Sequence, residues 1–89
     1  MALKYIVGHI GFAIFDEGQT HAHMAARMSS RPEGAGFCTI AVGYQRPDQD
    51  GLGGGEYVNV HCYGESITLG LKSRVEDEEI IQRGINTYH

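Results

Sequence analysis

The chain has 89 residues, a formal net charge of −4 and 13 glycines. This length makes one domain, residues 1–89, with a small core, so we expect reinforcement by homo-oligomerisation. The acidic balance argues against a protein that binds duplex nucleic acid. No apolar run reaches the roughly 18 residues of a membrane span, and no signal peptide is recognisable. We therefore expect no membrane partner and a cytoplasmic location.

The first half of the chain predicts a strand, a helix and a second strand. Residues 4–15 alternate with apolar residues on both faces, which indicates a central strand with Gly8 and Gly11 at a bulge or close neighbour. Thr20 can N-cap a helix that ends near Met28. Its apolar spacing is carried by His21, Met24, Ala25 and Met28. Pro32 ends this region, and residues 36–44 read as the second strand, with Cys38, Ile40 and Val42 on its core face.

The second half predicts a hairpin partner and a final helix. Residues 48–55 form a glycine-rich loop, and residues 56–63 a third strand that turns Val58, Val60 and Cys62 to the core. Residues 67–71 are a fourth strand or a single helical turn. Ser73 and Glu76 have the spacing of a capping box, followed by an apolar stripe of Val75, Ile80, Ile81 and Ile85. The predicted fold is α+β, a small antiparallel sheet of three to four strands with two helices, in the order β-α-β-β-(β)-α.

The cysteines and histidines do not predict a metal site or a cofactor. Cys38 and Cys62 lie in apolar strand-like runs, so we interpret them as buried free thiols, with a single disulfide as the alternative. His21 and His23 are two residues apart, which places them on different sides of a helix. No pair has the spacing of a zinc site.

Two sequence patterns resemble catalytic sites, but each supports catalysis less well than the sequence supports ligand binding. Residues 64–68 are similar to a nucleophile elbow but end in Thr68 rather than glycine, so Ser66 is better read as a cap or a ligand hydroxyl. His9 and His61 could share a sheet face and act as an acid–base pair, which remains an alternative. We predict no catalytic residues and no enzyme.

The residues best suited to a ligand lie in and after the third strand. Hydroxyls and cations gather at Ser66, Thr68, Lys72, Ser73 and Arg74, which suits a phosphate at a helix start. Tyr57, His61 and Tyr63 lie on the outer face of the strand, where a base could stack. Two alternatives stay open: the cations neutralise the acidic residues at 76–79, or the aromatic face is a dimer interface.

One part of the sequence carries a resemblance. Gly36-Phe-Cys38 and the run from Cys62 through Arg74 to Glu76-Asp77 resemble small phage and prophage accessory proteins. These have an A-G-F segment before a C-Y-G-E-S-x-S/T-L-G-L-K-S-R-P-E-D run, and Val75 stands here in place of proline. The resemblance covers about half of the chain and implies a viral protein of the host cytoplasm.

That resemblance implies no activity of its own, but it suggests an anti-defence role. We expect a sponge that sequesters a nucleotide second messenger without catalysis, in which the partner is a nucleotide-type small molecule. The first alternative is a protein-directed inhibitor that uses the acidic helix at residues 76–79. A small nucleotide-cleaving enzyme is the second alternative.

Overall fold

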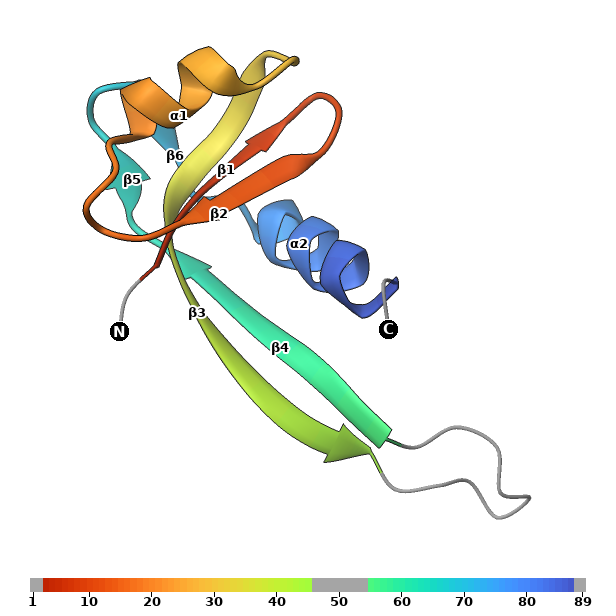
Figure 1. Ribbon diagram of the computed structural model, residues 1–89. Coiled ribbons are helices and arrows are strands. Elements are labelled where there is room, and N and C mark those ends of the chain that lie inside the picture. Colours follow the sequence, from red (N-terminus) through yellow and green to blue (C-terminus); the bar gives the residue numbers. More distant parts are fainter. Residues whose placement is uncertain (1–2, 46–54, 88–89) are drawn as a thin grey trace.

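The computed structural model describes residues 3–45 and 55–87, and the side chains of residues 3–43 and 58–87. Its elements are β1 (Leu3–Gly8), β2 (Phe12–Phe15), α1 (His21–Arg27), β3 (Pro32–Gln45), β4 (Gly55–Tyr63), β5 (Glu65–Ser66), β6 (Leu71–Lys72) and α2 (Val75–Thr87). An antiparallel sheet has the order β2-β1-β3-β4, and β5 pairs with β6 (Figure 1). The predicted α+β class is confirmed. The predicted loop over residues 48–55 lies outside the described residues, except that Gly55 begins β4.

The predicted single strand over residues 4–15 is wrong, because this segment is a hairpin of β1 and β2. Gly11 has a φ of 83°, a conformation that glycine adopts without strain, and the Gly8 N–H donates to the Gly11 carbonyl at 2.9 Å. Alternation is the same in one strand or in two strands joined by a tight turn, so the pattern cannot distinguish them. The expected central position is confirmed for β1, which lies between β2 and β3.

The two helices cover opposite faces of the sheet, which explains why β1 is apolar on both sides (Figure 1). On the α1 face, Ile6 packs with Phe15 and Ala35 beneath the helix. On the α2 face, Tyr5 and Val7 belong to a larger cluster with residues of β3, β4 and α2. Alternate residues of one strand therefore reach two separate cores.

The β3–β4 hairpin extends beyond the rest of the sheet, and this corrects the predicted core face of β3. Register pairing of β1 with β3 ends at Leu3 and Cys38, whereas β3 and β4 stay paired to Gln45 and Gly55 (Figure 1). Ile40 and Val42 share the face of Cys38 but are 36% and 61% exposed, because neither β1 nor the core reaches them. β3 also begins at Pro32, four residues earlier than the predicted 36.

The outer edge of β4 is covered by polar side chains of α2. The Val60 N–H donates to Gln82 Oε1 at 3.0 Å, and the Val58 N–H donates to Asn86 Oδ1 at 2.9 Å. The Asn86 side-chain amide also donates to the Val58 carbonyl at 3.2 Å. Four helix residues rise about 6.0 Å and two strand residues about 6.7 Å, so positions four apart in α2 match alternate amides of β4. The helix thus closes a sheet edge that would otherwise be free to pair.

The predicted N-cap of α1 is confirmed, and the predicted N-cap of α2 is corrected. Thr20 caps α1, and its Oγ1 accepts from the His23 N–H at 3.0 Å. In α2 the expected capping box of Ser73 and Glu76 is wrong. The Arg74 N–H donates to Asp77 Oδ2 at 3.0 Å, so the cap lies one residue later than predicted.

Two further segments differ from the sequence prediction. Residues 67–70 form a turn between β5 and β6, rather than a strand or a helical turn. In α2, Ile81 is fully buried and Ile85 packs on the core, but Val75 and Ile80 of the predicted stripe are exposed. Among the described helices, none is both long and apolar enough to span a membrane.

Candidate functional site

The five hydroxyl and cationic residues of the predicted phosphate site do not converge on one point. In the β5–β6 pair, Ser66 lies opposite Leu71 and Lys72 opposite Glu65. Ser66 is 2% exposed, and its Oγ accepts from the Leu69 N–H at 3.3 Å, so this hydroxyl stabilises the turn. Neighbouring residues of a strand point to opposite faces, so Lys72 lies outward on the face of Glu65.

Arg74 is bound within the protein by Asp77. Its Nε and Nη2 atoms lie 2.9 and 2.8 Å from Asp77 Oδ1, and the carboxylate is completely buried. Burial alone would lower the pKa of Arg74, but the hydrogen bonds and charge of Asp77 outweigh it and raise that pKa. This contact matches the alternative in which a cation neutralises the acidic helix start.

Asp77 also joins α2 to the centre of the sheet. Tyr5 Oη donates to Asp77 Oδ2 at 2.6 Å, in a site without solvent contact. A Cβ on Gly34 would lie 2.2 Å from the same oxygen, so β3 can pass here only with glycine. Burial, followed by the hydrogen bond and charge of Asp77, raises the pKa of Tyr5 far above 10.0. The Tyr5–Asp77 contact is sealed from solvent, and it holds the fold rather than a ligand.

Ser73 and Thr68 keep positions from which a ligand could be reached. The Ser73 N–H donates to the Gly64 carbonyl at 3.0 Å, which places Ser73 beside the residue that follows Tyr63. Thr68 is exposed in the turn between β5 and β6. Of the predicted cluster, Lys72 and Ser73 therefore lie nearest to the aromatic strand face, and Thr68 lies farther along the β5–β6 hairpin.

The predicted aromatic face is present and is longer than the sequence indicated. Tyr63 stacks on Phe37, with ring centroids 6.0 Å apart and planes at 25°, and on His61, at 5.9 Å and 20°. The Phe37 ring packs edge-on against the His21 ring, and the His21 ring packs edge-on against Phe15. We call these five residues the aromatic row. Tyr63 and His61 are exposed, and this end of the row is the flat surface available for stacking.

The predicted site also contained Tyr57, whose side chain lies outside the described residues. Its backbone pairs with Gly43 in the hairpin. By strand alternation Tyr57 belongs to the same face as His61 and Tyr63.

Two residues beside the aromatic row were not anticipated. Lys4 lies across from Phe37 in the sheet, as Phe37 does from Tyr63, and its Nζ donates to the Gln19 carbonyl at 2.8 Å. Glu78 reaches around the edge of β4 and accepts from His61 Nδ1 at 3.2 Å. Both residues are close only through strand register and helix docking, so no local signal in the sequence could have placed them.

Among the described histidines, His9 and His61 lie too far apart to form a catalytic pair. His9 lies in the β1–β2 turn, six positions along the chain from Leu3 at the far end of β1, a distance of about 20 Å. His61 lies on the hairpin beyond that far end of β1, so the possible pairing of His9 with His61 is wrong. His21 is buried, and its Nε2 donates to the Gly36 carbonyl at 2.9 Å. Over residues 3–45 and 55–87, no group of three potential metal ligands occurs.

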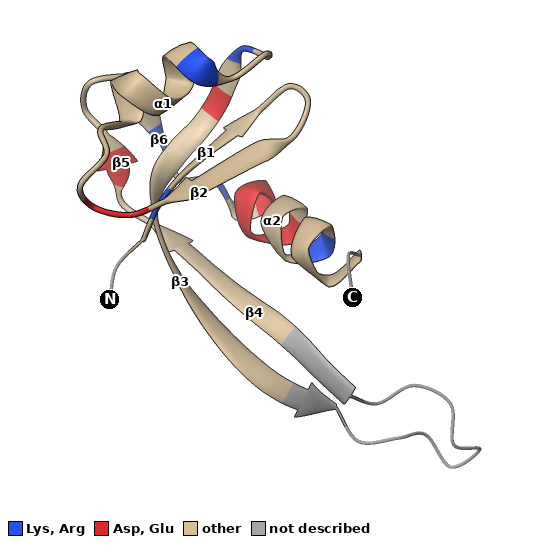
Figure 2. Ribbon diagram, in the orientation of Figure 1, with Lys and Arg blue, Asp and Glu red and all other residues tan. Residues whose placement is uncertain are grey.

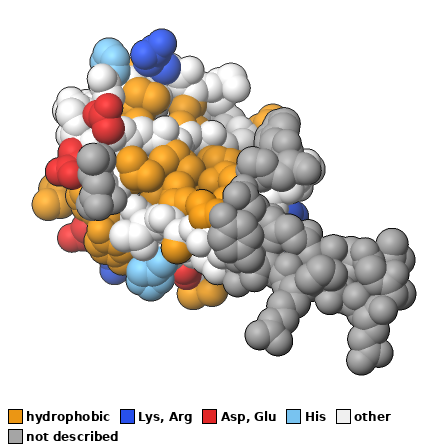
Figure 3. Space-filling view, turned by 60° about the horizontal axis from the view of Figure 1, so that its bottom comes forward, with side chains coloured by type: hydrophobic (Ala, Val, Ile, Leu, Met, Phe, Trp, Pro, Cys, Tyr) orange, Lys and Arg blue, Asp and Glu red, His pale blue; other side chains and the backbone are white. Residues whose placement is uncertain are grey.

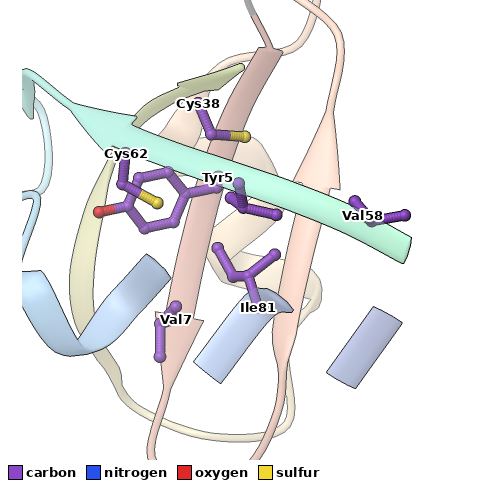
Figure 4. Packing of buried hydrophobic residues seen from close by; sticks show 7 residues of the cluster. Tyr5, Val7, Cys38, Val58, Cys62 and Ile81 are labelled. Atoms are coloured by element: carbon purple, nitrogen blue, oxygen red, sulfur yellow. The ribbon is translucent and has the colours of Figure 1, made fainter. Parts of the chain in front are cut away.

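The cysteines lie on the opposite face of the hairpin, within the core (Figure 4). Cys38 and Cys62 are register partners, and both are buried free thiols, as predicted. Burial first, and then the charges of Cys38, Glu78 and Asp77, raise the pKa of Cys62 to about 12. Burial likewise raises the pKa of Cys38. These thiols are protonated at neutral pH and have no access to a ligand on the aromatic row.

Comparisons of the chain with protein-family models, curated proteins and solved structures gave no match.

Proposed function

We propose that this protein binds a nucleotide-type small molecule and holds it without chemical change, as a sponge for a second messenger. The observation that carries the proposal is the exposed end of the aromatic row, where His61 and Tyr63 lie nearly parallel. Bases stack on such surfaces with little dependence on sequence, because every base has a flat π-face. The resemblance to small phage accessory proteins supports sequestration as the biological purpose.

Cations at both sides of this surface suit the phosphates of such a ligand. Lys72 and Ser73 follow Gly64 on one side, and Lys4 lies two strands from Tyr63 on the other, about 10 Å away along the sheet. Arg74 is not part of this set, because Asp77 binds its guanidinium. A base on Tyr63 with phosphate near Lys72 is the arrangement that uses the free groups.

The positions of the titratable groups support a protein that holds its ligand without cleaving it. Asp77, Tyr5 and Cys62 are buried on the α2 face, whereas the aromatic row lies on the α1 face. Among the described residues, His61 is the histidine exposed beside the proposed base, and its Nδ1 is bound to Glu78. General acid–base catalysis on a phosphate needs two such groups at hydrogen-bonding distance from the reacting atoms.

A thermal-shift panel of nucleotides and cyclic nucleotides tests the proposal, since a ligand at 100 times its Kd stabilises a protein by about 2.7 kcal/mol. For the ligand that binds, Tyr63→Leu should weaken binding about 5- to 150-fold, because stacking contributes roughly 1–3 kcal/mol per base. Lys72→Ala should weaken it about tenfold or more, as expected for a charged hydrogen bond.

Two exposed residues of α1 give matched controls. His23→Ala and Arg27→Ala remove the same kinds of side chain away from the row and should leave the affinity unchanged. Ligand recovered intact after denaturation supports sequestration, and a cleaved product supports the enzyme instead. The proposal is refuted if no nucleotide shifts the melting temperature at millimolar concentration, or if Tyr63→Leu binds as the parent does.

One observation favours the protein-directed inhibitor as a second candidate. Glu76 and Glu79 are exposed at the start of α2 and form an acidic surface there (Figure 2). Such a surface could occupy the nucleic-acid site of a host defence enzyme. In an inhibition assay, Glu76→Gln with Glu79→Gln should then abolish the effect while Tyr63→Leu does not. The opposite pattern supports the sponge.

A further inference from the structure

In the projecting β3–β4 hairpin, the edge of β4 is covered, whereas part of the edge of β3 is open. The β4 edge is covered by Gln82 and Asn86 of α2. The β3 edge has β1 beside it only as far as Cys38, and over residues 39–45 no other described strand lies on that side. A strand edge left open in this way can pair with another chain.

The hydrogen-bonding direction of this open edge follows from the contacts of β4. Val58 and Val60 direct their amides to α2, so their partners across the ladder, Val42 and Ile40, form non-hydrogen-bonded pairs with them. The N–H and C=O groups of Ile40 and Val42 therefore point away from β4, toward the open edge. The backbone N–H and C=O groups of Tyr44, two residues farther along β3, point in the same direction.

A second copy of this chain fits the open edge in one register. Antiparallel self-pairing centred on Val42 matches 40 with 44 of the second copy, 42 with 42, and 44 with 40. Each of these pairs can exchange two backbone hydrogen bonds. A centre one residue earlier would match 38 with 44, but Cys38 is already paired with Leu3. Centring on Val42 uses residues 39–45 in full and leaves the β1–β3 pairing intact.

The chemistry of the edge also suits a second copy. Residues 34–45 contain no charged side chain, so two copies of this acidic protein bring no like charges together along the ladder. A two-fold axis perpendicular to the sheet keeps both α2 helices on one face. There the exposed Ile40 and Val42 of both copies would become neighbours. Seen from the hairpin side, hydrophobic side chains gather in the middle of the molecular surface (Figure 3).

We propose that this protein forms a reversible homodimer by antiparallel pairing of β3 with β3 of a second copy, with the two-fold axis at Val42. Seven strand residues are about 24 Å long and a sheet about 10 Å thick, so the ladder covers about 480 Å² in total. Stable interfaces bury about 1,000 Å² or more. We therefore infer a dimer that is populated at high micromolar concentration and dissociates on dilution.

Sedimentation equilibrium and disulfide trapping test this geometry. The mass should rise from 9.7 kDa toward twice that value as concentration increases from low to high micromolar. Val42→Pro removes an N–H that points away from β4, so the hairpin should be retained while association weakens at least about tenfold. Val42→Lys keeps the backbone N–H but places a charge on the open edge, so it should also weaken association.

A Val42→Cys variant should form a disulfide between two copies, because hydrogen-bonded partners have Cα atoms about 5.5 Å apart, within the range of a disulfide. Asn59→Cys, exposed on β4 and one strand away from the axis, should not crosslink. The native thiols are buried and serve as the background. The proposal is overturned if the parent protein stays monomeric at high micromolar concentration. It is equally overturned by a dimer that neither position-42 variant weakens, or by Val42→Cys that crosslinks no faster than Asn59→Cys.

Discussion

Replacing Asp77 with alanine tests whether the buried carboxylate holds α2 on the sheet. The substitution removes the acceptor of Tyr5 Oη, of the Arg74 amide and of the Arg74 guanidinium together. The buried Tyr5 hydroxyl and the Arg74 amide lose their acceptor at about 1–3 kcal/mol each, whereas the Arg74 side chain is 30% exposed and can be hydrated, so we expect a total cost of about 2–6 kcal/mol. An 89-residue domain has a free energy of unfolding of about 4–13 kcal/mol, so we expect the variant to lose a large share of its stability.

Urea unfolding followed by far-ultraviolet circular dichroism at neutral pH gives the free energy directly. Tyr5→Phe removes one hydrogen bond to the same charge and should cost about 1.5–3 kcal/mol. Combined with Asp77→Ala, it should add less than that, since the two side chains share the contact. Glu79→Ala is the matched control, because its exposed pairing with Arg83 should contribute about 0.3–0.5 kcal/mol. If Asp77→Ala and Glu79→Ala differ by less than about 1 kcal/mol, the structural role assigned to Asp77 is wrong.

Alkaline pH should destabilise the protein, because Cys62 keeps its proton in the fold to about pH 12 while an unfolded thiol releases it near 9.0. Below pH 9 its contribution is complete, and above it Cys62 by itself should lower the unfolding free energy by about 1.4 kcal/mol per pH unit, with Cys38 and, above pH 10, Tyr5 adding to the slope. Urea midpoints between pH 8 and 11 measure this slope, and a Cys62→Val variant with the same slope would contradict it. Gln82→Leu should cost about 1–3 kcal/mol and speed amide exchange at Val60, whose N–H loses its acceptor. Gln82→Glu keeps an acceptor and should preserve the protection, so equal exchange in both variants would refute the edge-covering role.

Features that depend on near neighbours along the chain were predicted correctly. The α+β class followed from alternation and helical spacing, and α1 began where Thr20 provides a side-chain cap. The inward face of β4, with Val58 and Cys62, was also correct. These features are local because a strand alternates every residue and a cap spans one helical turn.

Which residues meet across the sheet and between sheet and helix could not be predicted from the local sequence. Glu76 and Asp77 both stand near the start of α2, but Asp77 faces Tyr5 of β1, so it becomes the buried cap. Val42 has the sequence pattern of a core residue, yet it is exposed because β1 ends beside Cys38. Register and docking join residues far apart in the chain, and local periodicity contains no information about which of them meet. The same reason explains why Arg74 is bound to a carboxylate while Lys4, at the other end of the sequence, lies beside the aromatic row.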